Sequence, residues 1–316
     1  MKINIVAACD PGFAQHLAAM LLSLAETNAR HELSIFVLWN GPPNEETNLR
    51  QVLAGTPFEY SLIDVSDDAF TDLTGGVNFT VTTYARLLIG DHLPREIDRV
   101  LYLDGDILIR GDLQQLWTTD LQGRTAAAVT DLPRYEFNST LGLPPGAPYF
   151  NAGVLLIDLA RWRRLEVGER ALAFARRHPD RLRWCDQCAL NLILHDDWIR
   201  LDRVWNFQSM DLAHVINGHV RFDAVDPGRL ASARIVHFNG RSKPWHYLND
   251  HPLKGEYLRY RRRTPWPVVR FEDRHPRNIA RKFLLRYAPA VLGAYGELRK
   301  LAGMSAAQIS TQDPSV

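Results

Sequence analysis

The sequence predicts an α/β fold in which helices cover both faces of a mostly parallel sheet. The main observation is that apolar runs of strand length alternate with longer segments whose apolar residues recur at helical spacing, a pattern typical of doubly wound sheets. The composition of the 316 residues agrees, because 46% are apolar and 23% are charged, as in an ordinary globular domain. One large domain with an extension is the organisation expected for this length.

The first half of the chain contains the clearest alternation. A strand over 3–8 is followed by a helix over 13–26, whose apolar residues repeat at positions i, i+3 and i+4. A second strand over 33–39 stops at the turn-forming stretch Asn-Gly-Pro-Pro-Asn. Further on we expect a helix over 45–54, a strand over 58–65, a helix over 82–93 that begins with a threonine cap, and a strand over 99–104.

The second half continues the pattern. Its expected elements are strands over 126–131, 150–159 and 233–240 and helices over 160–178 and 186–196. These elements place a single domain at residues 1–250. A basic, aromatic and helical extension is expected over 251–302, and the polar residues 303–316 are expected to form a disordered tail.

Positive charge is concentrated in the extension. Residues 254–302 contain thirteen Lys or Arg and four Asp or Glu, although the whole chain has a net charge of only +1. Arg277, Arg281 and Lys282 lie close to Phe283 in an amphipathic stretch, which is typical of helices on anionic membrane surfaces. The alternative is a helix packed on the core with a solvated basic face. No nucleic-acid recognition module accompanies the charge, so nucleic acid is not an expected partner.

Cysteine content and hydropathy favour a cytoplasmic location. Three cysteines, Cys9, Cys185 and Cys188, do not make a disulfide framework, which is typical of a reducing compartment. No run approaches the ~18 apolar residues of a membrane span, and too few precede Cys9 for the ~7–15-residue core of a signal peptide. Cys185 and Cys188 form a C-x-x-C motif, but a redox role is not favoured so late in this chain, and one further thiol cannot complete a four-cysteine zinc site.

The stretch VLYLDGD, residues 100–106, indicates where the chemistry lies. Ligands of α/β sheets bind where strands end, and two carboxylates at i and i+2 on an extended chain point to the same side. The side chains of Asp104 and Asp106 can therefore contact the same ligand, and Gly105 between them leaves room for that ligand. The first strand is not followed by G-x-G-x-x-G and the chain has no P-loop motif, so neither of those nucleotide-binding folds is supported.

Two chemistries stay open for this pair of acids. In a haloacid dehalogenase-like phosphatase Asp104 would be the covalent nucleophile and Asp106 a general acid, although the apolar residues after Asp106 do not fit that motif. Alternatively, the pair binds a divalent cation that neutralises a nucleotide diphosphate. His237 at a strand end would move the preference from Mg²⁺ toward Mn²⁺, and Lys243 offers a positive charge for phosphate.

Five blocks between residues 3 and 246 resemble glycosyltransferase family 8 in the family's order. They are AACDPGFAQHL, TTYARLLIGDHL, VLYLDGDILIRGDLQQLW, YFNAGVLLIDLARW with DQCALN, and VHFNGRSKPWH. The family consists of retaining sugar transferases and includes bacterial lipooligosaccharide galactosyltransferases, lipopolysaccharide glucosyltransferases and, more distantly, glycogenin. The resemblance implies a single GT-A type nucleotide-diphospho-sugar transferase domain with a Rossmann-like sheet.

The resemblance also implies the roles of individual residues. Mn²⁺, or alternatively Mg²⁺, would be bound by Asp104, Asp106 and His237. The uracil ring would contact Ala8 and Asp10 and would stack on Phe13, where relatives usually have Tyr. The diphosphate would lie against Gly240 and Lys243, and Gly105 would also contact the nucleotide-sugar. The donor sugar would be surrounded by the expected catalytic residues Arg86, Asn151, Asp186 and Gln187.

Two positions depart from the family pattern. Gly12 stands where relatives frequently have Asn, which removes one polar contact to the nucleotide. Cys188 replaces a common acid, so Asp186 is the only carboxylate of its block. Asp186 would stabilise positive charge at the sugar, whereas Gln187 would either form a covalent intermediate or assist a reaction on one face of the sugar. An amide is a poor nucleophile, which favours the same-face route.

The resemblance implies a metal-dependent, retaining hexosyltransferase that moves glucose or galactose from UDP-glucose or UDP-galactose. The expected acceptor is a lipooligosaccharide, a lipopolysaccharide or a related cell-surface glycan, including lipid-linked oligosaccharides. The expected location is cytoplasmic, at the inner face of a bacterial membrane. The alternative from another class is an inactive sugar-nucleotide-binding protein, which would have no need for the intact acids, His237 and Lys243.

Overall fold

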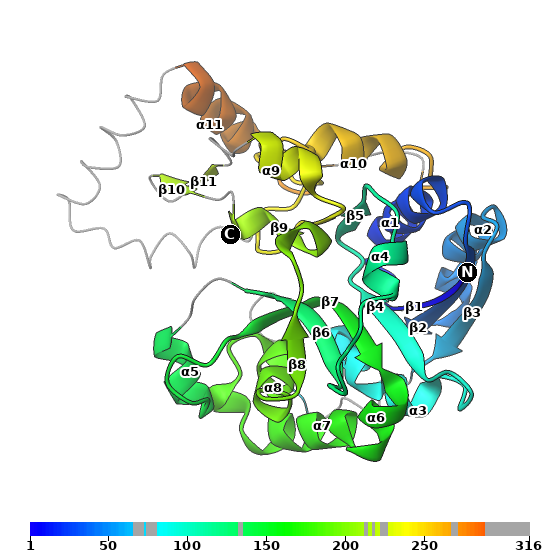
Figure 1. The fold of residues 1–316 in the computed structure, drawn as a ribbon. Coiled ribbons are helices and arrows are strands. Elements are labelled where there is room, and N and C mark those ends of the chain that lie inside the picture. The colour runs from blue at the N-terminus through cyan, green and yellow to red at the C-terminus, as the bar shows by residue number, and fades with distance from the viewer. Residues whose placement is uncertain are drawn as a thin grey trace.

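The computed structural model describes residues 1–65, 73, 81–131, 135–211, 214–216, 219–221, 227–266 and 271–287 (Figure 1). The strands are β1 Lys2–Cys9, β2 Glu32–Trp39, β3 Glu59–Asp64, β4 Arg99–Leu103, β5 Ile107–Ile109, β6 Ala126–Thr130, β7 Phe150–Asp158, β8 Trp198–Arg200, β9 Phe207–Gln208, β10 His214–Ile216, β11 His219–Arg221 and β12 Ile235–His237. The α-helices are α1 Ala14–Thr27, α2 Thr47–Ala54, α3 Ile89–His92, α4 Gln114–Trp117, α5 Tyr135–Leu141, α6 Leu159–Arg164, α7 Val167–Arg177, α8 Cys185–Ile193, α9 Pro227–Ser232, α10 Lys254–Arg261 and α11 Pro276–Tyr287.

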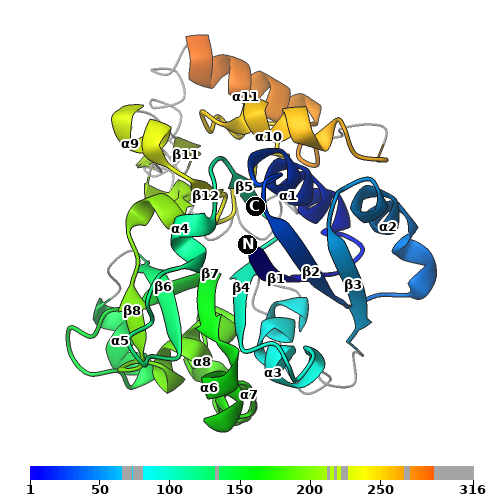
Figure 2. The same ribbon diagram turned by 45° about the vertical axis from the view of Figure 1, so that its right-hand side comes forward.

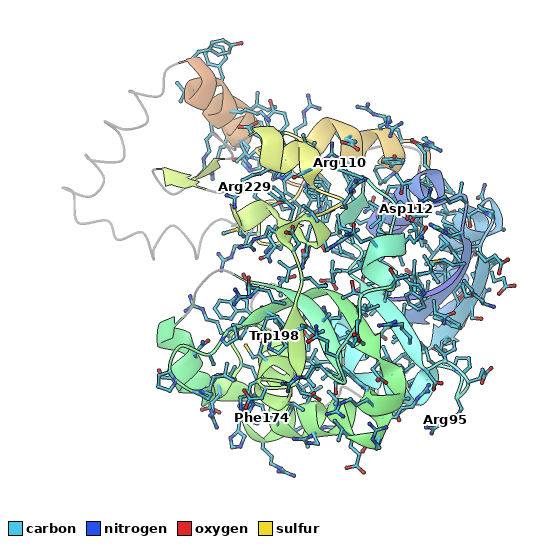
Figure 3. The ribbon with its side chains drawn as sticks, in the orientation of Figure 1. Arg95, Arg110, Asp112, Phe174, Trp198 and Arg229 are labelled. Carbon is cyan, nitrogen blue, oxygen red and sulfur yellow. The ribbon has the colours of Figure 1, made fainter. Side chains whose placement is uncertain are left out.

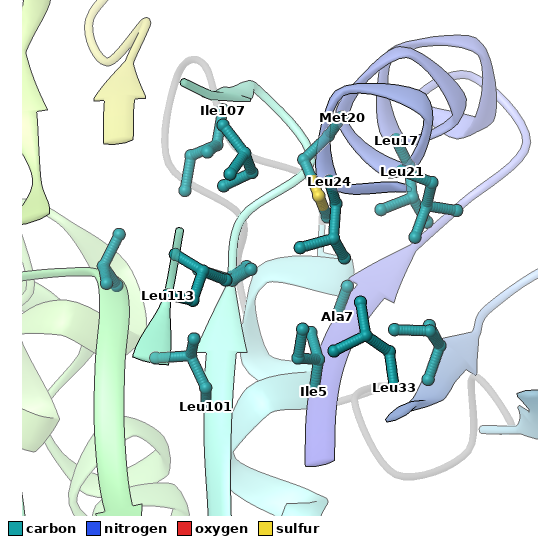
Figure 4. Packing of buried hydrophobic residues seen from close by; sticks show 14 of the residues in the cluster. Ile5, Ala7, Leu17, Met20, Leu21, Leu24, Leu33, Leu101, Ile107 and Leu113 are labelled. Carbon is teal, nitrogen blue, oxygen red and sulfur yellow. The ribbon is translucent and has the colours of Figure 1, made fainter. Parts of the chain in front are cut away.

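The centre of the molecule is a seven-stranded sheet in the order β3-β2-β1-β4-β7-β6-β8. Neighbouring strands are parallel except at β7, which runs antiparallel to both β4 and β6. Ile5 and Ala7 of β1 pack toward α1 (Figure 4), whereas Val6 packs with Tyr84 and Trp162 on the other face. The predicted α/β fold with a mostly parallel sheet is therefore confirmed, and apolar strands are buried because helices cover both faces.

A second, small sheet in the order β5-β12-β9 lies beyond the end of β4. β12 pairs antiparallel with β5, so that His237 lies opposite Ile107. Strand β5 begins one residue after Asp106, and β12 ends at His237. This pairing brings two acids and a histidine from distant parts of the sequence to one place.

The first residues of the predicted extension belong to the core. Tyr257, Leu258 and Tyr260 of α10 are buried in one cluster with Ala19 of α1 and Leu108 of β5. Arg110, labelled in Figure 3, also pairs with Glu256 of α10 at 3.1 Å. In two views α10 and α11 lie at the end of the molecule opposite α6 and α7 (Figures 1 and 2). The predicted tail over 303–316 lies outside the described residues.

Two predicted helices differ from the structure. The segment predicted as one helix over 82–93 is a 3-10 helix, Val81–Leu88, followed by the short α3. Three residues per turn place Thr83 and Arg86 on the same side, and both contact Asp186. The helix predicted over 160–178 is divided into α6 and α7 at Glu166, whose φ of 52° lies in the left-handed region and ends the first helix.

Short elements were not predicted. Strands β5, β8 and β9 contain two or three residues each, too few to show a periodicity of two.

Within the part of the chain that is described, no helix combines the length and apolar character needed to span a membrane.

Candidate functional site

Asp104 and Asp106 lie in the turn between β4 and β5, at the point where the chain leaves the central sheet. The Nε2 atom of His237 lies 3.2 Å from Asp106 Oδ1 and 3.6 Å from Asp104 Oδ2. One ligand atom from each of the three residues lies within 4.8 Å of the others. Two carboxylates and an imidazole in this arrangement can hold one divalent cation, with the imidazole favouring a transition ion over Mg²⁺.

The imidazole of His237 is oriented by two asparagines. Its Nδ1 lies 3.1 Å from Asn151 Oδ1 and 3.2 Å from Asn206 Oδ1, both of which are hydrogen-bond acceptors. The Gly153 amide donates to Asn151 Oδ1 at 3.0 Å, which identifies that atom as an oxygen, and Asn206 Nδ2 donates to the same atom. A proton on Nδ1 leaves Nε2 free as a ligand, the usual arrangement around a metal-binding histidine.

Gly153 provides the space in which these ligands meet. A Cβ atom at this position would overlap Cε1 of His237 and would lie 2.7 Å from Asp104 Oδ2. The backbone carbonyl of Gly153 also accepts a hydrogen bond from the Asp104 amide at 2.9 Å. Sequence reasoning did not assign Gly153 or Asn206 a role, because neither carries a metal-binding group and only the folded chain reveals their proximity. Asp104, Asp106 and His237, with the space that Gly153 leaves between them, therefore fit a metal ion.

Lys243 lies beside the acids, as the sequence predicted for a phosphate-binding cation. Its Nζ is 2.5 Å from Asp106 Oδ2 and donates to the carbonyl of Phe238 at 2.8 Å. Burial opposes ionisation of Asp106, but Lys243 and His237 outweigh it and hold the pKa of that carboxyl well below its usual range. Gly240, in the same loop, has a φ of 85°, which a glycine adopts without strain.

Arg86 joins the two acidic parts of the site. Its Nη2 lies 3.0 Å from Asp104 Oδ1, its Nε lies 2.5 Å from Asp186 Oδ2, and its guanidinium stacks 4.6 Å over the ring of Tyr102. Burial raises the pKa of Asp186 to about 6, and Arg86 and Thr83 only partly oppose this. The planar guanidinium holds two carboxylates at once, a task that a lysine could not perform with the same geometry.

Gln187 and Asn151 are adjacent in the structure. Gln187 Oε1 accepts from the Ala152 amide at 3.0 Å and from Asn151 Nδ2 at 3.2 Å, while Nε2 donates to Asp131 at 3.0 Å. The amide oxygen thus has two donors already. The four residues predicted to surround the donor sugar, Arg86, Asn151, Asp186 and Gln187, are connected to one another or to the metal ligands by the contacts above.

The residues predicted to bind the base lie at the end of β1. Asp10 Oδ1 accepts from the Phe13 amide at 2.9 Å, and Oδ2 accepts from Thr82 at 3.2 Å. The ring of Phe13 lies against Gly105, where an added Cβ would be 3.0 Å from its Cδ1. Ala8, the last residue but one of the same strand, is half-buried. Phe13 thus connects the predicted base site to the metal-binding turn.

Both thiols of the C-x-x-C motif lie inside the domain. Cys185 and Cys188 are buried, and Cys188 Sγ accepts from Tyr149 at 3.3 Å and from the Trp184 amide at 3.1 Å. Burial raises the pKa of Cys188 to about 11, so its thiol stays protonated at neutral pH. This agrees with the expectation that the motif does not serve redox chemistry.

Comparison with known proteins agrees with this geometry. The family model for Glycosyl transferase family 8 matches residues 4–249. General stress protein A of Bacillus subtilis (strain 168) is 31% identical over 282 residues, which are 84% of this chain and 96% of that protein. Lipopolysaccharide 1,3-galactosyltransferase of Salmonella typhimurium (strain LT2) is 28% identical over 276 residues, 84% of this chain and 79% of that protein.

Among solved structures, the galactosyltransferase LgtC in complex with donor and acceptor sugar analogs is similar to this chain. The TM-score is 0.72 at 26% identity, and the match covers 89% of this chain and 100% of that one. The common fold is the GT-A type that the sequence predicted. The family match, the related sequences and the shared fold together show that the chain is a glycosyltransferase and belongs to glycosyl transferase family 8.

Proposed function

We propose that the protein is a metal-dependent, retaining hexosyltransferase that uses UDP-glucose or UDP-galactose as donor. The observation that carries the proposal is the cluster of Asp104, Asp106 and His237 with Lys243 beside it. A divalent ion bound there, Mn²⁺ in preference to Mg²⁺, would neutralise charge on the diphosphate leaving group. Lys243 adds a second positive charge on the same side, and both effects stabilise the group that departs.

The remaining residues suit the sugar end of the donor. Asp186 is held by Arg86 and by the hydroxyl of Thr83 at 2.7 Å, so that a carboxylate is fixed near the place where positive charge develops. Gln187 is fixed by donors on its oxygen and by Asp131 on its nitrogen. An amide oxygen that already accepts two hydrogen bonds is less available for attack on the sugar. This supports the same-face route over a covalent intermediate on Gln187.

The proposed acceptor is a glycan of the lipooligosaccharide or lipopolysaccharide type or a related lipid-linked saccharide. A relative with 28% identity is named as a lipopolysaccharide 1,3-galactosyltransferase, and a solved relative holds donor and acceptor sugar analogs. The family match does not favour the phosphatase alternative, in which Asp104 would attack a phosphate ester. An inactive sugar-binding protein would need neither an oriented imidazole nor a space kept open by Gly153.

The proposed place of action is the cytoplasmic face of a membrane, reached through α11. On this helix Ile279, Phe283 and Tyr287 are 42%, 61% and 65% exposed, which is unusual for large apolar side chains. Arg277 adds positive charge beside them. Lys282 forms an ion pair with Asp250 at 3.1 Å, which connects the helix to the preceding part of the chain. An apolar surface beside basic residues is suited to the interface of anionic lipids.

The test is a UDP-release assay with a panel of UDP-sugars, with and without Mn²⁺. We expect slow hydrolysis of one UDP-hexose that requires metal and that is lost in Asp106→Asn. Asp112→Asn is the matched control, because Asp112 lies in the same stretch but pairs with Arg30 at 2.6 Å, away from the cluster. Hydrolysis of a phosphate ester that is lost in Asp104→Asn, with no turnover of any UDP-sugar, would instead establish the phosphatase.

A further inference from the structure

A row of buried rings connects α10 to the loop that carries Lys243. His16 of α1 stacks on Trp245, with ring centroids 3.5 Å apart and an angle of 15° between the planes. The Nδ1 atom of His16 lies 2.6 Å from the hydroxyl of Tyr257 in α10. All three side chains are buried, so this arrangement is an internal part of the domain.

The same rings fix Phe13, the residue expected to stack on the base. The Phe13 ring meets His16 edge to face at 5.2 Å and meets Trp245 in the same manner at 5.7 Å. Gly105 also lies against this ring, and the absence of a side chain there lets the ring approach the metal-binding turn. Edge-to-face contacts favour one ring orientation, so His16 and Trp245 together set the plane of Phe13.

Trp245 also fixes the direction of Lys243. The two residues lie in one turn, closed by a hydrogen bond from the His246 amide to the Lys243 carbonyl at 2.9 Å. The Lys243 ammonium lies 5.9 Å from the Trp245 ring and points to Asp106. A turn anchored at Trp245 can therefore hold the ammonium where the diphosphate is expected.

His16 is suited to this structural task because it is uncharged. Burial lowers its pKa to about 3, with Arg261 as the next cause. A neutral imidazole can stack on an indole and share a single hydrogen bond with the phenol without introducing an unpaired charge.

We propose that His16, Trp245 and Tyr257 are positioning residues for the donor, which orient Phe13 toward the base and Lys243 toward the diphosphate. Helix α10 thereby contributes to nucleotide affinity without touching the nucleotide. This inference rests on the proposed use of a UDP-sugar. Helix α10 would thus have a role in donor binding, although its sequence indicates only a basic extension.

The experiment compares the full chain with His16→Ala and Tyr257→Phe. Affinity for UDP is measured by calorimetry in the presence of Mn²⁺, and hydrogen exchange is followed at residues 243–246. We expect His16→Ala to raise the Kd for UDP about tenfold, which corresponds to a binding-competent loop population of about one tenth. Exchange at 243–246 should become faster, and Tyr257→Phe, which keeps the ring, should cause a smaller change of the same kind.

The matched control is His31→Ala. The His31 side chain is also buried, at 4% exposed, but it pairs with Asp112 beyond the far end of α1. This variant should keep the parent Kd and exchange rates. An unchanged Kd in His16→Ala, or an equal loss in His31→Ala, would overturn the inference. A parent that binds no UDP would refute the proposed donor, while exchange at 243–246 would still decide whether His16 orders the turn.

Discussion

Gly153 lies directly against the imidazole of His237, so closely that a Cβ on its backbone would overlap the ring. Gly153→Ala should therefore displace His237 and lower the affinity for Mn²⁺ by about 10- to 100-fold, as changes around metal ligands commonly do. Electron paramagnetic resonance of free Mn²⁺ during titration measures this affinity. Gly255→Ala is the control, because a Cβ there has no atom within 4 Å. Equal affinities in both variants would contradict the assigned metal position.

Asn206 is expected to affect the metal through the orientation of His237. Asn206→Ala removes one acceptor from Nδ1 and a donor from Asn151, which should reduce Mn²⁺ affinity by about 10-fold or more. Asn28→Ala is a suitable control, since Asn28 is equally buried and bonds to the Leu113 amide at 2.8 Å, far from the cluster. If both variants bind Mn²⁺ like the parent, the imidazole is not oriented by this network.

Arg86 should be required for folding stability as well as for the site. Arg86→Leu leaves Asp104 and Asp186 without their shared partner, and removing one member of a buried ion pair costs about 3–5 kcal/mol. The free energy of unfolding in urea measures the loss. The double variant with Asp186→Asn should recover part of it, because one of the two orphaned charges is removed. Failure of the second change to recover any stability would show that Asp186 is not the charge that Arg86 compensates.

Stability should fall in acid because of His251. Burial lowers the pKa of this histidine from 6.5 to about 4. Between these values the unfolded chain binds more protons at this histidine than the folded one, so its contribution to stability is complete above about pH 6.5 and decreases as the pH falls, with a slope of up to about 1.4 kcal/mol per pH unit. His16, whose pKa is lowered to about 3, adds to this slope, and Asp186, whose pKa is raised to about 6, opposes it. Urea unfolding at pH 7 and pH 5 should show the loss. His251→Asn retains an acceptor for the Leu253 amide and should reduce the pH dependence.

Helix α11 is expected to bind anionic vesicles. Phe283→Ser removes a ring that is 61% exposed and should weaken co-sedimentation with vesicles that contain phosphatidylglycerol. The free energy of binding should fall by the contribution of several buried methylene groups, at ~0.8 kcal/mol each. Arg277→Gln should have a smaller effect, of ~1 kcal/mol, that disappears at high salt. Turnover with a water-soluble acceptor should be unchanged in both variants. Binding equal to that of the parent in both Phe283→Ser and Arg277→Gln would contradict the proposed contact through this helix.

Much of the sheet could be predicted because its strands are long and buried on both faces. β1, β2, β4 and β7 are near-continuous apolar runs, and each was expected within a few residues of its observed bounds. The direction of β7 could not be predicted, because an apolar run does not record the orientation of the strand. Short strands such as β5 carry no periodicity, and only their pairing in the fold reveals them.

In the candidate site, too, some residues could be predicted from the sequence and others could not. Charged and polar ligands such as Asp104 and His237 could be named from the resemblance to a family and from their chemistry. Gly153, Asn206 and His16 act by the space they leave or by the neighbours they hold. These properties arise from contacts between distant residues: Asn206 and His237 are 31 positions apart, and His16 and Tyr257 are 241 positions apart. A pattern in the sequence carries no such information, since a glycine or an asparagine alone predicts a turn as readily as a site.

The reversed direction of β7 has a consequence for how acceptor choice can change. Because β7 runs antiparallel to both of its neighbours in the central sheet, Asn151 and Gly153, near its start, lie beside the end of β4. The segment just before Phe150 therefore enters β7 at the end of the sheet where Asp104 lies. Insertions there would remodel the rim of the site while every strand keeps its pairing. This makes the segment a natural target for redesigning acceptor specificity.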